Sequence, residues 1–436
     1  MRIAMIGTGY VGLVSGACLS EFGHQVVCVD RDVQKVAGLR EGRIPIFEPR
    51  LDEVVAANVR AGRLSFDTEI AAAVRGADAV FIAVGTPSRR GDGHADLSYV
   101  YAAAEEIAAA LDRYTVIVTK STVPVGTSRE VEAIIRRVRP DAQFDMASNP
   151  EFLREGSALE DFRKPDRVVV GCDTEAARSV MREVYRPLYL HETPIVFTSR
   201  ESSELIKYAA NAFLATKITF INEMADLCEK VGADVQDVAR GIGLDGRIGN
   251  KFLHAGPGFG GSCFPKDTLA LRKTAEDYGA PTRIVEAVVA VNDARKLAMA
   301  QKIDTAFGGV GGKTVAILGL TFKPNTDDMR DAPSLAIVPD LQARGARVRA
   351  FDPEGMTEAA RHFNIEFCTD AYDTIDGADG VVILTEWNEF RALDMPRMKS
   401  MLKRPLMVDL RNIYQPAQMA AAGFTYVSVG RASVAP

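Results

Sequence analysis

The turn after the first buried segment constrains the fold of this chain more than any other feature. Residues 2–6 are predicted to form a core strand, and three glycines follow it in the spacing Gly-x-Gly-x-x-Gly. Gly7 permits a tight turn, Gly9 lets a pyrophosphate approach backbone amides, and Gly12 allows a helix to pack closely on the strand. The N-terminus of that helix attracts the phosphate charge. The spacing therefore predicts the phosphate-binding turn of a dinucleotide-binding domain.

The residue that ends the second predicted strand indicates which dinucleotide binds. Asp30 follows the apolar segment 25–29 and takes the place of the ribose-binding acid. Its carboxylate accepts hydrogen bonds from both ribose hydroxyls and repels a 2′-phosphate, which favours NAD over NADP. Arg31 is able to receive a 2′-phosphate, so NADP remains the alternative. The predicted cofactor is NAD.

Short apolar segments alternate with helical patterns early in the chain, as in a parallel sheet that is covered on both faces. The predicted strands are 2–6, 25–29, 78–84, 115–119, 144–148 and 168–171. Long helices are predicted over 202–230 and 281–306, and α/β alternation resumes at Lys313. The segment 76–84, which is Gly-Ala-Asp followed by an apolar strand, is echoed at 377–385. The predicted fold class is α/β, with two Rossmann-like doubly wound domains joined by a long-helix region.

Length and composition exclude several classes of protein. A chain of 436 residues is too long for one hydrophobic core, so two or three domains are expected. The formal net charge of −6 argues against general nucleic-acid binding, which usually needs a basic excess. No apolar run approaches the ~20 residues of a membrane span, and no signal-peptide pattern is present. The six cysteines show neither C-x-x-C spacing nor a histidine cluster, which indicates the reducing cytoplasm and no metal site.

A glycine-dense loop at 256–265 contains the most informative cysteine. The sequence around it is Phe259-Gly-Gly-Ser-Cys263-Phe-Pro-Lys266-Asp267. The glycines bring the backbone close to a ligand, and Pro-Lys-Asp predicts a helix that starts just downstream. A cysteine near a helix N-terminus tends to be a thiolate, which is the nucleophilic form. From these residues alone, a reactive thiol and a structural cysteine are about equally supported.

Other polar side chains lie where an α/β protein binds ligands. Lys207 and Asn211 are four apart on one face of a predicted helix with apolar neighbours, and an ammonium with an amide suits an oxyanion or a sugar hydroxyl. Thr122 follows a predicted strand, as do Glu151 and Glu155, and open α/β sheets bind ligands at strand ends. Each segment alone is more often a solvated helix face or a capped turn than a site.

A series of motifs makes the chain resemble the UDP-glucose/GDP-mannose dehydrogenase family over essentially its whole length. The motifs are Gly7-Thr-Gly-Tyr-Val-Gly12, Gly85-Thr-Pro87, Ser121-Thr-Val-Pro124, Asn149-Pro-Glu-Phe-Leu-Arg-Glu-Gly156, Lys207 to Asn211, Arg247-Ile-Gly-Asn-Lys-Phe252, Gly258-Phe-Gly-Gly-Ser-Cys263, and Phe322-Lys-Pro324 with Arg330. The resemblance implies an NAD-binding domain at 1–198, a central helical dimerisation domain with the cysteine loop at 199–307, and a UDP-sugar-binding domain at 308–436. It also implies a homodimer or higher homo-oligomer.

The resemblance further implies a four-electron oxidation of UDP-glucose to UDP-glucuronate through a thiohemiacetal and a thioester on Cys263. The implied catalytic residues are Cys263, Lys207, Asn211, Asp267, Thr122, Glu151 and Glu155. The residues implied for NAD are Gly7, Gly9, Tyr10, Val11, Gly12, Asp30, Lys35, Thr86, Thr122, Glu155, Lys266 and Arg330. The residues implied for the UDP-sugar are Glu151, Phe152, Leu153, Lys207, Asn211, Arg247, Phe252, His254, Gly260, Lys323 and Arg411. The choice of general base between the two glutamates stays open, and Arg247 would reach in from a partner subunit.

Two kinds of alternative remain. GDP-mannose and UDP-N-acetylmannosamine are rival substrates, but relatives that act on the latter tend to have a histidine before the nucleophile and no lysine after the proline. Ser262 and Lys266 occupy these places here, which favours UDP-glucose. A catalytically silent NAD-binding scaffold would not need Cys263, Lys207 or Asp267. A two-electron dehydrogenase with a helical second domain would produce one NADH per sugar.

Overall fold

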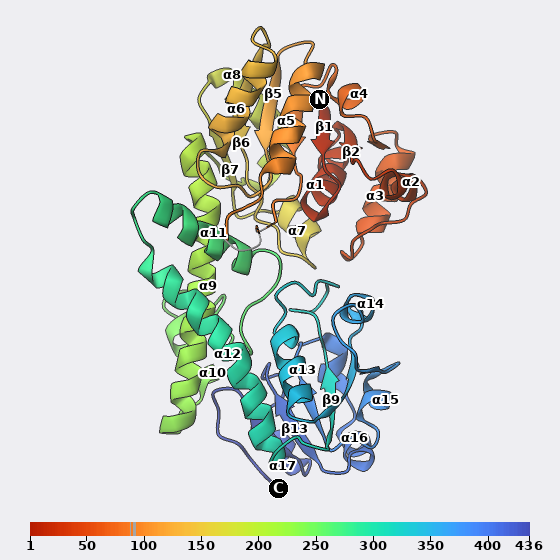
Figure 1. The fold of residues 1–436 in the computed structure, drawn as a ribbon, viewed down its shortest axis with the longest axis vertical. Coiled ribbons are helices and arrows are strands. Elements are labelled where there is room, and N and C mark those ends of the chain that lie inside the picture. Colours follow the sequence, from red (N-terminus) through yellow and green to blue (C-terminus); the bar gives the residue numbers. More distant parts are fainter. Residues whose placement is uncertain (88, 90–92) are drawn as a thin grey trace. The chain divides into compact units, whose positions relative to one another are not determined.

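Two separate sheets organise the chain, one in each of its two units (Figure 1). The computed structural model describes residues 1–87, 89 and 93–436. The N-terminal unit comprises Met1–Ala210 and Leu269–Ala280, and the C-terminal unit comprises Asn211–Thr268 and Pro281–Pro436. Of the described helices, none combines the length and apolar character that a membrane span needs.

The sheet of the N-terminal unit has the strand order β3-β2-β1-β4-β5-β6-β7-β8. Its strands are β1 (Arg2–Ile6), β2 (Gln25–Val29), β3 (Leu64–Asp67), β4 (Ala79–Ile82), β5 (Thr115–Thr119), β6 (Phe144–Ser148), β7 (Val168–Cys172) and β8 (Ile195–Thr198). From β3 to β6 all pairs are parallel, in the order of a dinucleotide-binding domain. β7 pairs antiparallel with β6, and β8 is parallel to β7.

Both faces of this sheet are buried, because alternate strand residues face two different apolar cores. In β1, Ile3 and Met5 pack in one core, whereas Ala4 and Ile6 pack in the other. The helices of this unit are α1 (Tyr10–Glu21), α2 (Val33–Arg40), α3 (Leu51–Arg60), α4 (Ile70–Val74), α5 (Ser98–Ala110), α6 (Thr127–Val138), α7 (Ala158–Arg163), α8 (Glu175–Val184) and the 3-10 helix η1 (Arg186–His191). The prediction of a doubly wound sheet is confirmed.

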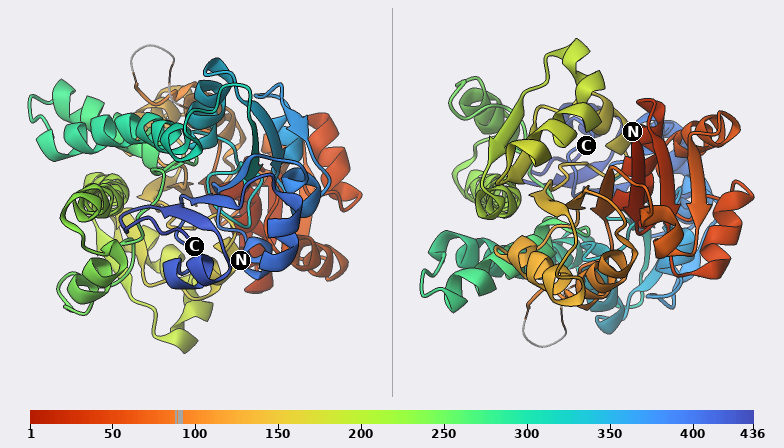
Figure 2. Two further views of the ribbon diagram at one scale, coloured as in Figure 1. Left: turned by 90° about the horizontal axis from the view of Figure 1, so that it is seen from below. Right: turned by 90° about the horizontal axis from the view of Figure 1, so that it is seen from above.

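The C-terminal unit contains a second parallel sheet in the order β11-β10-β9-β12-β13-β14, with helices on both of its faces (Figure 2). Its strands are β9 (Thr314–Leu318), β10 (Arg347–Phe351), β11 (Glu366–Phe367), β12 (Gly380–Ile383), β13 (Leu406–Asp409) and β14 (Thr425–Ser428). Its own helices are α13 (Ser334–Ala343), α14 (Met356–Ala359), α15 (Ala371–Ile375), η2 (Asn388–Ala392), α16 (Met395–Met401) and α17 (Pro416–Ala421). When the strands of each unit are numbered from 1 in chain order, the first six strands of each sheet lie in the order 3-2-1-4-5-6.

The repeated Gly-Ala-Asp segment has the same structural role in both units. Each copy leads into the strand that pairs with the first strand of its sheet, β4 with β1 and β12 with β9. The Asp78 carboxylate accepts a hydrogen bond from the Arg2 amide at 2.9 Å, and the Asp379 carboxylate accepts one from the Thr314 amide at 2.8 Å. The echo in the sequence therefore marks two equivalent positions in two related folds.

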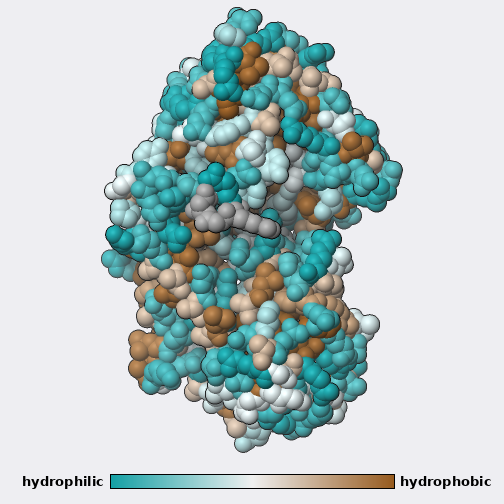
Figure 3. Space-filling model, in the orientation of Figure 1, coloured by the Kyte–Doolittle hydropathy of each residue, from teal (hydrophilic) through white to brown (hydrophobic). Residues whose placement is uncertain are grey.

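Long helices lie between the two sheets in the sequence. They are α9 (Arg200–Val231), α10 (Val235–Gly243), α11 (Phe264–Asp277) and α12 (Arg283–Phe307). The predicted helices at 202–230 and 281–306 match α9 and α12 to within about two residues. On α9, Phe213, Phe220 and Leu227 recur every seven residues with exposed fractions of 66%, 45% and 52%. Hydrophobic side chains gather on the surface where α9 and α10 lie (Figure 3).

Candidate active site

The turn between β1 and α1 has the backbone that its glycines predict. Gly7 has a φ of +104°, and a Cβ there would lie 2.6 Å from the carbonyl oxygen of Ala83. A Cβ at Gly12 would lie 2.0 Å from the carbonyl oxygen of Gly7, so only glycine lets α1 approach β1 this closely. At Gly9, apart from the glycine itself and its chain neighbours, no atom of the described residues lies within 4 Å of the Cβ position. The turn leaves open space at the N-terminus of α1, where a pyrophosphate binds.

Asp30 stands beside this turn as an ionised carboxylate. Its Oδ2 accepts hydrogen bonds from the Thr8 hydroxyl at 2.6 Å and the Lys35 ammonium at 2.9 Å. Burial tends to raise the pKa of Asp30, but these hydrogen bonds outweigh burial and lower it to about 2. Arg31 instead pairs with Glu106 at the surface. The carboxylate is therefore charged, which suits an acceptor for ribose hydroxyls.

The ends of β4 and β5 are joined by hydroxyl groups. The Thr86 hydroxyl donates to the carbonyl oxygen of Thr122 at 3.0 Å, and the Ser121 hydroxyl donates to the carbonyl oxygen of Val84 at 2.7 Å. Thr86 is 8% exposed. Both loops follow the carboxyl ends of parallel strands, the edge at which open α/β sheets bind ligands.

A buried ion pair connects the loop after β6 to α9. The Lys207 ammonium donates to the Glu151 carboxylate at 3.0 Å, and the side chains are 3% and 5% exposed. The other oxygen of Glu151 accepts from the backbone amide of Leu153. The ammonium also lies 5.3 Å from the centre of the Phe152 ring, and the Arg167 guanidinium lies 3.7 Å from that centre. Two predicted catalytic residues are thus in direct contact.

Glu48 is a buried residue that the sequence reasoning missed. Its carboxylate accepts from the backbone amides of Gly156 and Ala158, both at 2.7 Å, and from the Tyr10 hydroxyl. Burial and the Glu48 carboxylate raise the pKa of Tyr10, and the charge of Glu155 acts in the same direction. Glu48 therefore ties the cofactor turn to the end of the 149–156 motif. The only signal in the sequence was a lone acid among Ile46-Phe-Glu-Pro49.

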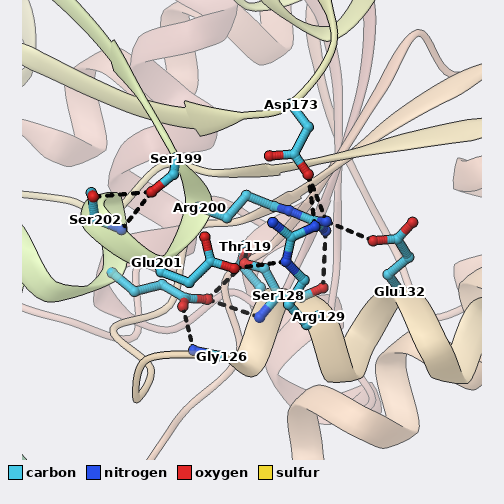
Figure 4. A network of polar contacts seen from close by, with 11 residues as sticks. Thr119, Gly126, Ser128, Arg129, Glu132, Asp173, Ser199, Arg200, Glu201 and Ser202 are labelled. Carbon is cyan, nitrogen blue, oxygen red and sulfur yellow. Dashed lines mark hydrogen bonds and ion pairs between the residues drawn. The ribbon is translucent and has the colours of Figure 1, made fainter.

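The first turn of α9 is fastened to the sheet by charged side chains. Arg200, 3% exposed, pairs with Glu132 at 2.7 Å and with Asp173 at 2.8 Å (Figure 4). Arg129 bridges the same Asp173 at 2.7 Å and Glu201 at 2.6 Å (Figure 4). This network holds the start of α9 against α6 and the end of β7.

Glu204 fixes the register of α9 one turn further on. It is 2% exposed, and its carboxylate accepts from the backbone amides of Gly126 at 2.7 Å and Ser128 at 2.8 Å. Burial raises the pKa of Glu204, which these hydrogen bonds partly oppose. This contact caps the N-terminus of α6, the helix that follows Thr122 in the chain. Glu204 itself lies on α9, three residues before Lys207. Glu204 therefore links the turn of α9 that precedes Lys207 to the N-terminus of α6.

Cys263 directly precedes α11 in the C-terminal unit, as predicted. Its side chain is half-buried, and its Sγ lies 3.4 Å from the Ser262 hydroxyl. Asp267 in the first turn of α11 is 1% exposed. One Asp267 oxygen accepts from the Lys266 ammonium and the other from the Asn211 amide, both at 2.6 Å. Three predicted site residues thus form one cluster, with the thiol four residues before its carboxylate.

Two of the residues predicted for the UDP-sugar, Lys323 and Arg411, lie at the switch point of the second sheet, between β9 and β12. The Arg411 guanidinium donates to the carbonyl oxygens of Leu384, after β12, at 2.8 Å and of Phe322, after β9, at 2.9 Å. Lys323 lies beside it, with its ammonium 5.3 Å from the centre of the Phe322 ring. A Cβ at Gly256 would lie 3.5 Å from Arg411. The crevice at such a point is where open α/β sheets bind nucleotides.

The glycines of the cysteine loop are needed for packing within the C-terminal unit. A Cβ at Gly260 would lie 2.3 Å from the carbonyl oxygen of Asp331, and one at Gly261 would lie 2.7 Å from the Phe322 ring. Gly261 also has a φ of +85°. Sequence reasoning explained these glycines by close approach of a ligand. In the structure, the segment that follows β9 makes that approach, with the Asp331 backbone at Gly260 and the Phe322 ring at Gly261.

Other predicted residues lie at the surface or near these clusters. Arg247 has a 90% exposed side chain that pairs with Asp245. Arg330 is 64% exposed and pairs with Asp328. His254 is exposed, and the left-handed φ of +64° at the nearby Phe252 marks a sharp turn in the loop.

Comparison with known protein families covers most of the chain. Residues 1–189 match the NAD binding domain of the UDP-glucose/GDP-mannose dehydrogenase family. Residues 201–294 match the central domain of that family, and residues 316–416 match its UDP binding domain. The resemblance found in the sequence and the prediction of NAD as cofactor are confirmed.

Individual relatives match along the full length. A UDP-glucose 6-dehydrogenase of Rhizobium meliloti is 65% identical over 435 residues, which cover 99% of this chain and 100% of the relative. A UDP-glucose 6-dehydrogenase of Bacillus subtilis, TuaD, is 48% identical and covers 99% and 94%. Among solved structures, a UDP-glucose dehydrogenase of Pyrobaculum islandicum is 40% identical with a TM-score of 0.91, covering 99% of this chain and 98% of that one.

Proposed function

Because the chain belongs to the UDP-glucose/GDP-mannose dehydrogenase family, we propose that it oxidises the C6 alcohol of UDP-glucose to the carboxylate of UDP-glucuronate. The observation that carries the proposal is the half-buried thiol of Cys263 at the start of α11, four residues before an Asp267 carboxylate locked by Lys266 and Asn211. A primary alcohol becomes an acid by losing four electrons. Bound NAD supplies the hydride acceptor for each of the two oxidations.

Cys263 holds the half-oxidised carbon in this scheme. The first oxidation yields an aldehyde, and the thiolate attacks its carbon so that a C–S bond forms and the carbonyl oxygen becomes an oxyanion. The second oxidation removes a hydride from this thiohemiacetal and leaves a thioester. Water adds to the thioester carbon, the C–S bond breaks, and the carboxylate and the thiol are released. The reactive aldehyde is never set free.

Polar side chains take the supporting roles. Lys207 and Asn211 donate hydrogen bonds to the oxyanion. The hydrogen bond from Asn211 Nδ2 to Asp267 at 2.6 Å sets the orientation of that amide. Asp267 and Thr122 orient the attacking water, and the proton of the alcohol passes to a carboxylate of the 149–156 motif. The choice between Glu151 and Glu155 as that base stays open.

The amount of NADH formed per sugar consumed tests the proposal. UDP-glucose, GDP-mannose and UDP-N-acetylmannosamine are supplied in turn in limiting amount with excess NAD. Two NADH per UDP-glucose, with little turnover of the other sugars, supports the proposal. One NADH per sugar identifies a two-electron dehydrogenase, and no NADH with any sugar identifies a silent NAD-binding scaffold.

We also propose that the chain forms a cytoplasmic homodimer through α9. Phe213, Phe220 and Leu227 form an exposed apolar stripe with seven-residue spacing, which is typical of helices that pack against a partner helix. Of the predicted domains at 1–198, 199–307 and 308–436, the second is the dimerisation domain, and it contains α9. The 90% exposed Arg247 would act on the partner's substrate. Light scattering on Phe220→Asp tests the proposal, because a charge in the stripe should yield a monomer.

A further inference from the structure

The segment 255–261, which leads to Cys263, is buried although it lies outside the helices and strands. Buried backbone amides and carbonyls need hydrogen-bond partners, which regular secondary structure supplies from other backbone groups. In this segment, side chains of two long helices take that part. The Gly256 amide donates to the side-chain oxygen of Asn222 on α9 at 2.8 Å. The Gly256 carbonyl oxygen accepts from Arg295 Nε on α12 at 2.6 Å.

Asn292 bonds to both polar backbone groups of one residue in this segment. It lies on α12 and is 4% exposed. Its Oδ1 accepts from the backbone amide of Phe259 at 2.8 Å, and its Nδ2 donates to the carbonyl oxygen of Phe259 at 3.1 Å. The side-chain amide thus pairs with Phe259 as a residue of a neighbouring strand would. A Cβ at Gly258 would lie 2.9 Å from this Oδ1, so the glycine lets the amide approach.

The Phe259 ring connects this contact to the proposed nucleophile. Phe259 is 7% exposed and packs in a small apolar core with residues of α9 and α12. The centre of its ring lies 6.0 Å from that of Phe264, in an edge-to-face arrangement. Phe264 directly follows Cys263 and begins α11. The contacts therefore run from Asn292 through the backbone and the ring of Phe259 to the residue next to the thiol.

We propose that Asn292 is a positioning residue that holds the Cys263 thiol where it captures the aldehyde. The inference rests on the proposed function, because it needs an aldehyde for the thiol to attack. The first oxidation passes one hydride from C6 to NAD and one proton to a base, and it forms no C–S bond. The second acts on the thiohemiacetal, so it depends on that bond. A displacement of about 1 Å slows a reaction by up to about 10²-fold, and a thiol so displaced should let the aldehyde escape after one NADH.

Asn292→Leu tests the proposal, because it replaces the amide by two methyl groups that neither donate nor accept. UDP-glucose is supplied in limiting amount with excess NAD and an alkoxyamine, which traps free aldehyde as an oxime. The native enzyme should form two NADH per sugar and little oxime. The variant should approach one NADH per sugar with a matching amount of oxime, and its kcat should be about 10- to 10²-fold lower. NAD affinity should be unchanged, because the cofactor turn lies in the N-terminal unit.

Alkylation of the thiol reports on the loop without turnover. The five other cysteines are buried, so iodoacetamide should modify Cys263 first. In Asn292→Leu the modification should be at least about twofold faster, because a half-buried thiol becomes more accessible when its loop loosens. Mass spectrometry of the modified protein identifies the site and gives the rate. If the variant retains no turnover, this rate decides the test.

Asn58→Leu is the matched control for the loss of a buried asparagine. Asn58 lies on α3 in the N-terminal unit and is 2% exposed. Its Nδ2 donates to the carbonyl oxygen of Val54 at 2.9 Å, and its Oδ1 accepts from the Arg63 guanidinium at 2.9 Å. The control should lower the melting temperature as Asn292→Leu does. It should still form two NADH per sugar and be alkylated at the native rate.

Three results would overturn the inference. Two NADH per sugar without oxime in Asn292→Leu would mean that capture of the aldehyde does not depend on Asn292, whatever the change in kcat or melting temperature. Alkylation at the native rate would mean that Asn292 does not hold the thiol. Release of aldehyde by Asn58→Leu as well would mean that any loss of stability has this effect.

A second variant covers the case in which Asn292→Leu does not fold. Phe259→Leu removes the ring contact with Phe264 and retains the backbone groups that bond to Asn292, and the same release of aldehyde is expected. Two NADH per sugar in that variant would also overturn the inference. The failure of the proposed function would appear separately, in native enzyme that does not form two NADH per UDP-glucose. The alkylation rates would then still test the position of the thiol.

Discussion

Replacing Lys207 by methionine leaves the Glu151 carboxylate buried without its bonded cation. The two charged atoms are 3.0 Å apart, and both side chains are at most 5% exposed. Two unit charges at that distance attract by about 5.5 kcal/mol at an effective dielectric constant of about 20, which is an upper bound on the loss. Measured losses on breaking one side of a buried pair are about 3–5 kcal/mol. Because the Glu151 carboxylate still accepts a hydrogen bond from the backbone amide of Leu153, we expect a loss at the lower end of this range, about 3 kcal/mol.

Differential scanning calorimetry measures this loss as a shift in melting temperature. In a unit of this size 1 kcal/mol corresponds to about 2–4 °C, so Lys207→Met should melt about 6–12 °C lower than the native protein. The double variant Lys207→Met/Glu151→Gln removes both charges, and the amide oxygen that replaces the carboxylate still accepts from the backbone amide of Leu153. We expect the double variant to recover to within about 1 kcal/mol of native stability, because a whole buried pair contributes little.

Two results would refute this reasoning. A melting temperature of Lys207→Met within about 2 °C of native would mean that Glu151 is not held as a buried anion. A double variant that melts as low as the single one would mean that lost packing, and not the unpaired charge, causes the loss. Both variants should be inactive in the proposed reaction, so stability is measured independently of turnover.

Three further predictions follow from the two glycine-rich segments and the ribose acid. Cys263→Ser and Cys263→Ala should lower turnover by about 10³-fold or more and leave NAD affinity, measured by fluorescence titration, unchanged. If either variant releases product at an undiminished rate, the thiol is not the nucleophile. Gly12→Ala should lower the melting temperature, because its Cβ would lie 2.0 Å from the Gly7 oxygen. Gly9→Ala should melt at the native temperature and bind NAD more weakly. Equal melting temperatures of the two variants would contradict the packing argument. The pKa of Asp30 is lowered to about 2, so the stabilisation by its ionised carboxylate is complete above pH ~4 and is lost as pH falls toward 2. The difference in melting temperature between the native protein and Asp30→Asn should therefore be constant from pH 8 to 5. A difference that shrinks within that range would refute the low pKa of Asp30.

Some elements were predicted too long or not at all. The strand predicted at 78–84 ends at Ile82 as β4, because the residues after it turn toward the cofactor loop. The strands β3 and β8 were missed because both are edge strands of the sheet with exposed or half-buried side chains, and neither has the continuous apolar run that marks the equally short β4. The antiparallel pairing of β7 with β6 was also absent from the prediction. Strand direction depends on how the connecting segment packs.

The sequence by itself determined the features that depend on a few consecutive residues. Only glycine satisfies the backbone of the turn at Gly7 and the close packing at Gly12, and the acid at Asp30 follows the second strand directly. The repeated Gly-Ala-Asp segments likewise indicated two related sheets from the order of residues alone. In each case the constraint is steric or lies within one turn, so spacing along the chain is enough to read it.

Tertiary structure alone decided which polar side chains meet in the interior. Nothing in the spacing pairs Glu48 with an amide 108 residues away, or brings Lys120 to a tyrosine 65 residues away. A side chain that is taken out of water must find its partner wherever the fold brings one, and that partner is not encoded at any fixed separation. The buried charges around Glu151 are therefore a property of the folded N-terminal unit.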